Sequence, residues 1–93
     1  MRRAAKVDAN QEAIVDALRA AGYSVTSLAA VGNGCPDLLC GVNGRNVLLE
    51  VKMPGEKLNS TQKPWHRDWK GKAHVIWSAD DALFVMRNYG AMG

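Results

Sequence analysis

The chain has 93 residues, 47% hydrophobic and 23% charged, which is the balance of one globular domain spanning residues 1–93. Twelve basic and nine acidic residues give a formal charge of +3, which suits a polyanionic partner without requiring one. No stretch reaches the roughly 20 apolar residues of a membrane span, and no apolar run follows the basic start. We therefore expect no membrane partner and a cytoplasmic location.

The chain begins with a basic segment followed by a helix. Residues 1–8 carry three basic side chains, and we expect either a disordered arm that touches phosphates or a solvated terminus. Asp8 and Gln11 resemble a capping box, apolar residues then recur at helical spacing, and Gly22 supplies the stop. The first helix is therefore predicted over residues 9–21.

Three strands follow, two of them joined by a tight turn. Alternation predicts the first strand over residues 23–31. Asn43-Gly44 lies between two apolar runs and is a strong hairpin signal, because these residue types accept the positive φ angles of a type I′ turn. The hairpin strands are predicted over residues 37–42 and 46–52.

The remaining residues predict two further helices and one strand. The second helix is predicted over residues 60–71, with Pro64 in or just after its first turn. A fourth strand follows at 73–77, and Ser78 caps a last helix over 78–90. The order α-β-β-β-α-β-α predicts a small α/β domain with a mixed central sheet flanked by helices.

Cysteines and tryptophans are interpreted first as packing residues. Cys35 and Cys40 are expected to be small buried thiols, because their spacing to the two histidines fits no zinc site. Trp65 and Trp69 are predicted to pack the second helix onto the sheet, and Trp77 is predicted in the core. Base stacking by these rings is the alternative.

The hairpin brings two acidic residues and a lysine together. If Asn43-Gly44 forms the turn, Asp37 lies opposite Glu50, and directly opposed Cβ atoms on one face are about 4.5–5.5 Å apart. Lys52 lies two residues after Glu50 and therefore on the same face. A register slip of one residue would move Glu50 to the other face.

Opposed carboxylates in a partly buried strand pair both ionise only beside a positive charge. Lys52 could neutralise one of them, whereas a divalent cation would serve both, and an all-oxygen site suits Mg²⁺ or Mn²⁺. Such an ion stabilises charge on a phosphoryl group and activates water. The alternative is a buried ion-pair network that fixes the strand register.

Taken together, these motifs resemble the PD-(D/E)XK nuclease superfamily, and most closely its VRR-NUC (virus-type replication-repair nuclease) branch, in the standalone phage and bacterial form. The residues that carry the resemblance are Gly34-Cys35-Pro36-Asp37-Leu38, Glu50-Val51-Lys52, Leu58 and Gln62. The resemblance implies a restriction-endonuclease-like core with the element order given above.

The resemblance also implies roles for particular residues. Asp37 and Glu50 would be metal ligands, with the Val51 backbone carbonyl as a third, and Lys52 would be the catalytic lysine. Glu12 matches the acid of the first helix that reaches the metal through water. Without the resemblance, Glu12 would be interpreted as an exposed helix charge.

Two residues of the second helix complete the candidate set. Gln62 matches a glutamine that borders the active site, and its alternative is a capping partner for Asn59 or Ser60. His66 lies one helical turn later on the same side and is a candidate substrate contact. The candidate catalytic residues are Glu12, Asp37, Glu50, Lys52 and Gln62.

The implied function is that of a Mg²⁺- or Mn²⁺-dependent deoxyribonuclease. It would be a homodimeric endonuclease that cleaves structured DNA such as a four-way (Holliday) junction, in phage or bacterial replication, recombination or repair. The alternatives are a restriction-type or RNA-directed nuclease, and a non-catalytic module that binds nucleic acid or another partner on the same fold.

The predicted DNA-contacting surface is basic. If Glu12, Asp37 and Glu50 hold metal, six acidic residues remain against twelve basic ones, which favours binding to a phosphate backbone. A solvated helix face is the alternative for any one of these side chains. The predicted nucleic-acid-binding residues are Lys57, Lys63, His66, Arg67 and Lys70.

Overall fold

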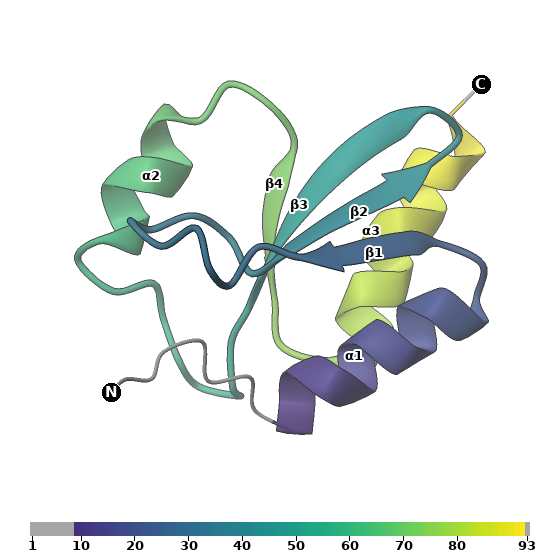
Figure 1. The fold of residues 1–93 in the computed structure, drawn as a ribbon, viewed down its shortest axis with the longest axis horizontal. Helices are drawn as coiled ribbons and strands as arrows, with labels where there is room; N and C mark the ends of the chain where they lie inside the picture. Colours follow the sequence, from purple (N-terminus) through teal and green to yellow (C-terminus); the bar gives the residue numbers. More distant parts are fainter. Residues whose placement is uncertain (1–8, 93) are drawn as a thin grey trace.

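The computed structural model describes residues 9–92, and its elements follow the predicted order α-β-β-β-α-β-α around a mixed four-stranded sheet (Figure 1). The helices are α1 (Ala9–Ala20), α2 (Gln62–Asp68) and α3 (Ala79–Ala91), and the strands are β1 (Ser24–Ser27), β2 (Leu38–Val42), β3 (Arg45–Val51) and β4 (Ala73–Ile76). The basic arm predicted at 1–8, including the capping role of Asp8, lies outside the described residues. None of the described helices has the length and apolar character needed to cross a membrane.

The sheet has the strand order β1-β2-β3-β4, in which the first three strands are antiparallel and β4 runs parallel to β3. Leu38 lies opposite Leu49, which confirms the hairpin register counted from the sequence. Asn43 and Gly44 have φ angles of 49° and 76°, so both turn residues adopt the left-handed conformation of a type I′ turn.

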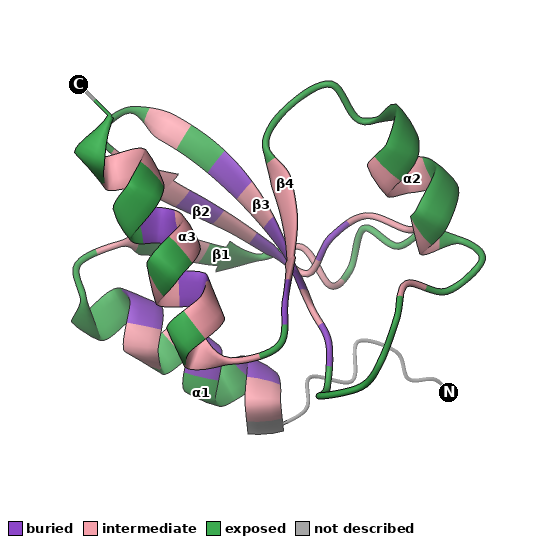
Figure 2. Ribbon diagram, turned by 180° about the vertical axis from the view of Figure 1, so that it is seen from behind, coloured by how far each residue is buried: buried purple, intermediate pink, exposed green. Residues whose placement is uncertain are grey.

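One face of the sheet forms the hydrophobic core beneath α1 and α3, which also pack against each other. Val47 and Leu49 are fully buried, as predicted for this face of β3. Figure 2 shows the buried segments on the strands and on the inner sides of these two helices. The core residues are Ile14, Leu18, Leu38, Cys40, Val47, Leu49, Ile76, Ala82 and Met86.

The other face of the sheet carries the polar site, because alternate residues of a strand point to opposite sides. Leu39 and Leu48 lie on this face and are half-buried, and Glu50 follows on β3. Helix α2 stands apart from α1 and α3 beyond the end of β3 (Figure 1), and none of its seven residues is fully buried (Figure 2). It therefore contributes to the site rather than to the core.

One predicted strand and one predicted helix are clearly longer than the observed elements. The strand predicted over 23–31 ends at Ser27, because Ser27 Oγ accepts the Ala29 N–H and the Val31 N–H bonds to the Leu28 carbonyl, which folds the chain into turns. The helix predicted over 60–71 occupies only Gln62–Asp68.

The start of α2 is fixed by a reciprocal cap. Asn59 Oδ1 accepts the N–H groups of Thr61 and Gln62, and Gln62 Oε1 accepts the Asn59 N–H. Pro64 fits because it lies in the first turn, where a missing N–H costs no intrahelical bond. The backbone at Trp69 is extended and ends the helix.

The C-terminal helix and the tryptophans differ from the predictions in detail. Ser78 Oγ accepts the Asp81 N–H as predicted, but α3 continues through Gly90 to Ala91. Trp77 was predicted in the core and is 39% exposed, since its indole N–H reaches out to the Glu56 carbonyl at 3.0 Å. Trp69 is 49% exposed and stacks on Trp65, with ring centroids 4.6 Å apart.

Candidate metal-binding active site

Asp37 lies at the start of β2 beside the end of β3. Its Oδ2 accepts the Val51 N–H at 2.8 Å, and its backbone carbonyl accepts the Leu28 N–H at 2.7 Å. The side chain therefore bridges the two hairpin strands where they leave the turn behind. This contact places Asp37 next to Glu50, as the register predicted, and places the Val51 backbone beside both carboxyl groups.

Glu50 is a nearly buried carboxyl group, with 2% of its surface exposed. Burial, followed by the hydrogen bond and charge of Asp37, raises its pKa to about 8, although the Lys52 ammonium partly opposes this rise. Gln62 Nε2 donates to Glu50 Oε2 at 3.1 Å. At pH 7, without a cation, the Asp37–Glu50 pair therefore retains a proton, which a bound metal ion would displace.

Lys52 lies on the same face as Glu50 and is 8% exposed. Its backbone N–H donates to the Ile76 carbonyl at 2.9 Å, and its own carbonyl accepts the Asn10 amide at 3.3 Å. The backbone is thus held between β4 and α1. The Lys52 charge opposes the rise in the pKa of Glu50 and adds to the lowering of the pKa of His66, so the ammonium group lies close to both side chains.

Gln62 combines the two roles that the sequence left as alternatives. Its carbonyl oxygen caps the turn at Asn59, and its amide nitrogen donates to Glu50. One side chain therefore sets the start of α2 and also joins that helix to the carboxylate pair.

His66 faces Glu50 from the next turn of α2. Its Nε2 lies 3.5 Å from Glu50 Oε1, and its side chain is 11% exposed. Among residues 9–92, these two are the buried side-chain nitrogen and oxygen atoms that have no hydrogen-bond partner. Burial, followed by the Lys52 charge, lowers the pKa of His66 and favours the neutral imidazole. Its predicted contact with substrate stays a prediction.

Gly34 brings the loop that carries Asp37 against the start of α2. Its φ angle is +83°, and a Cβ atom at this position would lie 2.5 Å from the Thr61 carbonyl oxygen. Only glycine fits such a close approach of two backbones. The sequence analysis used Gly34 only as part of a motif, although its place shortly before Pro36-Asp37 indicated a constrained loop.

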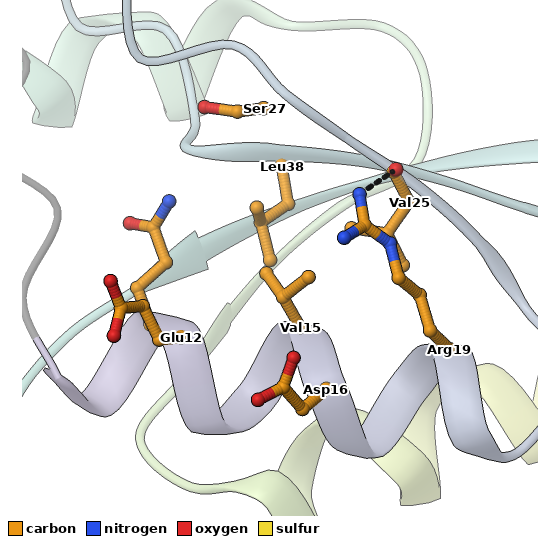
Figure 3. A pocket seen from close by; sticks show the side chains of 8 residues that line it. Glu12, Val15, Asp16, Arg19, Val25, Ser27 and Leu38 are labelled. Atoms are coloured by element: carbon orange, nitrogen blue, oxygen red, sulfur yellow. Dashed lines mark hydrogen bonds between the residues drawn. The ribbon is translucent and has the colours of Figure 1, made fainter.

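Glu12 lies on the exposed side of α1 and lines a cavity of about 310 Å³ between that helix and the sheet. Figure 3 shows Glu12 and Arg19 along the helix with Val15 between them, and Leu38 on the opposite wall. Leu38 follows Asp37 directly and is a core residue, so this cavity lies on the core side of the sheet, whereas Asp37 and Glu50 lie on the other face. The water-mediated route from Glu12 to a metal ion stays a prediction.

The two cysteines are free thiols. Cys40 is fully buried as predicted, and burial raises its pKa to about 11. Cys35 is half-buried, and burial, followed by the charges of Glu50 and Asp37, raises its pKa. A raised pKa keeps both thiols protonated and unreactive at neutral pH.

The predicted basic surface residues are exposed on or near α2. Lys63 and Arg67 lie on the helix, and Lys57 and Lys70 lie on either side of it. Arg67 forms two hydrogen bonds with Asp68, at 2.8 and 3.0 Å, so its charge is partly compensated.

The donor atoms can be tested against a divalent cation. No group of three or more His, Cys, Asp or Glu residues arranged to hold a metal ion occurs among residues 9–92. Mg²⁺, however, is commonly held by one or two carboxylates together with water and substrate oxygens. Asp37 and Glu50 supply two such carboxylates, and Glu50 Oε1 is buried without a hydrogen-bond partner.

The order of the elements and the mixed sheet are those that the PD-(D/E)XK resemblance implies. Comparisons of the chain with protein-family models, with curated proteins and with solved structures find no match, so the resemblance rests on the motif residues alone.

Proposed function

We propose that the chain is a Mg²⁺- or Mn²⁺-dependent endonuclease that hydrolyses DNA phosphodiester bonds. The observation that supports this most strongly is the carboxyl group of Glu50, almost fully buried beside Asp37 and Lys52. A fold gains nothing in stability from such a group, because burying a charge or an unpaired polar atom costs free energy. Its retention at the end of a core strand is explained by cation binding.

The carboxylates of Asp37 and Glu50, with the Val51 carbonyl, would hold the ion. A bound Mg²⁺ or Mn²⁺ supplies charge stabilisation at the scissile phosphate and activates water for attack. Asp37 is oriented by the Val51 N–H, and Glu50 is oriented by Gln62. Lys52 would donate hydrogen bonds to the phosphate or orient the attacking water, and in-line displacement would leave a 5′ phosphate and a 3′ hydroxyl.

The proposed substrate is structured DNA, such as a four-way junction. Four basic residues on or near α2 are exposed. The described residues contain no recognisable base-reading element, and contacts to phosphates select DNA by shape rather than by sequence. A homodimer with two-fold symmetry would present two such sites, one for each strand to be cut.

Cleavage of labelled four-way, flap and linear DNA, with Mn²⁺ or with EDTA, tests the proposal. We expect cleavage with Mn²⁺ only, and a loss of about 10²–10⁴-fold in Lys52→Ala, the range for removal of a group that transfers or positions a proton. Asp37→Ala should be equally inactive. Arg87→Ala removes an exposed charge on α3 and should match the wild type.

Cleavage that continues unchanged in Lys52→Ala or Asp37→Ala would contradict the proposed chemistry. Wild-type protein that binds junctions without cutting them, with every metal tested, would instead indicate a binding module on the same fold.

A further inference from the structure

The contact between His66 and Glu50 has no role in the proposed hydrolysis. His66 lies one turn after Gln62 on α2, and both side chains point at the same carboxyl group. Gln62 donates to Oε2, which leaves Oε1 facing the imidazole. The two oxygens of Glu50 thus meet two different neighbours on one helix.

The two facing atoms are both unsatisfied. Glu50 Oε1 and His66 Nε2 are each buried with no hydrogen-bond partner in residues 9–92, although they lie 3.5 Å apart. Leaving a buried donor or acceptor unpaired costs about 1–3 kcal/mol. Two such atoms that face each other are an unusual arrangement in a native protein. Without metal, the proton that Glu50 retains can lie between them at this long separation, and a cation that displaces the proton would bind both atoms instead.

A cation satisfies both atoms at the observed separation. Ligand bonds of about 2.0–2.2 Å at angles between octahedral and tetrahedral place two ligand atoms about 3.0–3.5 Å apart. A carboxylate oxygen and an imidazole nitrogen are both common ligands of divalent transition metals. Asp37 is hydrogen-bonded to Glu50. The three side chains do not form a ready-made three-ligand group among residues 9–92, so Glu50 Oε1 and His66 Nε2 are the two donor atoms already in place.

We propose that His66 Nε2 is a ligand of the cation held by Glu50 and Asp37, so that the centre is a mixed carboxylate–imidazole site that prefers Mn²⁺ to Mg²⁺. This inference rests on the proposed function, because it assigns a further ligand to the same site. Nitrogen ligands favour transition metals, whereas Mg²⁺ prefers oxygen and retains water. His66 would then coordinate the metal ion rather than contact the DNA.

Pulsed electron paramagnetic resonance of bound Mn²⁺ tests the inference directly, because a coordinated imidazole produces a ¹⁴N modulation of the echo. We expect this modulation in the wild type and its loss in His66→Gln. His74→Gln is the matched control: it removes the second histidine, which bonds the Tyr89 hydroxyl on the core side of the sheet, and should leave the modulation unchanged.

Affinities measured by calorimetry add a second readout. His66→Gln should weaken Mn²⁺ binding by about tenfold or more, the loss that even an outer-shell partner of a metal site causes, with a smaller effect on Mg²⁺. None of the α2 residues belongs to the buried core, so the variant should remain folded by circular dichroism.

The outcomes separate the two proposals. Mn²⁺ that binds and supports cleavage in wild-type protein without any ¹⁴N modulation would overturn the role of His66 and leave the proposed function intact. Failure of the wild type to bind Mn²⁺ at all would overturn both. The wild-type spectrum decides the question even if a variant does not fold.

Discussion

Glu50 is a carboxyl group that the fold buries almost completely beside a second carboxyl group. Its pKa of about 8 means that the folded protein binds a proton there under conditions in which the unfolded chain, with an ordinary glutamate pKa near 4.5, does not. The stability that Glu50 contributes to the metal-free fold therefore falls as the pH rises above 4.5, and the loss is complete once the pH has passed about 8. A cation would remove this penalty by replacing the proton.

Replacing Glu50 with glutamine tests this account of the residue. In EDTA, the free energy of unfolding of the wild type should fall relative to that of Glu50→Gln between pH 4.5 and 8, because only the wild type binds the extra proton across that window. The lowered pKa values of His66 and His74 act in the opposite direction, but both proteins contain these histidines. Glu50→Gln should therefore be more stable than the wild type at pH 8. Urea denaturation over this pH range measures both.

Glu12→Gln serves as the control for that experiment, since it removes an exposed carboxylate from α1. It should retain the wild-type pH slope. A wild-type stability that does not fall relative to that of Glu50→Gln between pH 4.5 and 8, or a Glu50→Gln variant less stable than the wild type at pH 8, would contradict the burial of a protonated Glu50.

Helix α2 is the element that completes the site. It contributes no fully buried residue to the core, yet Gln62 and His66 both reach Glu50 from it. Its position depends on the cap at Asn59 and on the close approach of Gly34 to Thr61. Local contacts of this kind, rather than core packing, hold α2 against the carboxylates.

Gly34→Ala should disturb this element more than Gly32→Ala does. Both glycines have positive φ angles, of +83° and +71°, so alanine strains each by about 1 kcal/mol or more. Only at Gly34 would the new Cβ also meet backbone, 2.5 Å from the Thr61 carbonyl oxygen, whereas nothing lies within 4 Å at Gly32. Urea denaturation and the DNA-cleavage assay compare the two variants.

We expect Gly32→Ala to retain cleavage close to that of the wild type, and Gly34→Ala to lose at least about tenfold while losing more stability. Equal effects of the two substitutions would show that the approach of Gly34 to α2 does not matter for the site.

The elements also show what could be predicted from the sequence. The Asn43-Gly44 turn fixed the register of β2 and β3, and with it the meeting of Asp37 and Glu50. The short extent of β1 could not be predicted, because it depends on turn hydrogen bonds beyond Ser27. The Trp77 error has a similar cause, since its indole N–H bonds to a loop carbonyl far along the chain.

The parts of the site that depend on alternation along a strand could be predicted from the sequence. The parts that depend on tertiary contacts were missed. Helical spacing placed Gln62 and His66 on one side of α2, but spacing alone does not reveal that His66 Nε2 faces Glu50 Oε1. The close approach of Gly34 to Thr61 likewise depends on how a loop meets a helix. Such contacts between distant segments leave no periodic pattern in the sequence.

For the whole molecule, charge is the property that bears on a polyanionic substrate. The chain carries a formal charge of +3, and α2 presents Lys63 and Arg67 on its exposed surface near the carboxylates. Arg67 is bonded to Asp68, so the two residues should not contribute equally to phosphate binding.

Junction binding in EDTA should weaken as salt is added, because phosphate contacts release counterions. Lys63→Ala should reduce the slope of log K against log salt by about 1, the effect of losing one phosphate contact. Arg67→Ala should reduce it less, since Asp68 already compensates that guanidinium. Fluorescence anisotropy at several salt concentrations measures the slopes, and a larger loss for Arg67→Ala than for Lys63→Ala would contradict this surface.

Mn²⁺ binding measured by calorimetry at pH 7, in buffers of different ionisation enthalpy, tests the central claim most directly. The wild type should bind Mn²⁺ and release about one proton per ion, because the cation displaces the proton of the Asp37–Glu50 pair. Glu50→Gln should lose this binding. A wild type that does not bind Mn²⁺, or a Glu50→Gln variant that binds it as tightly as the wild type, would contradict the account.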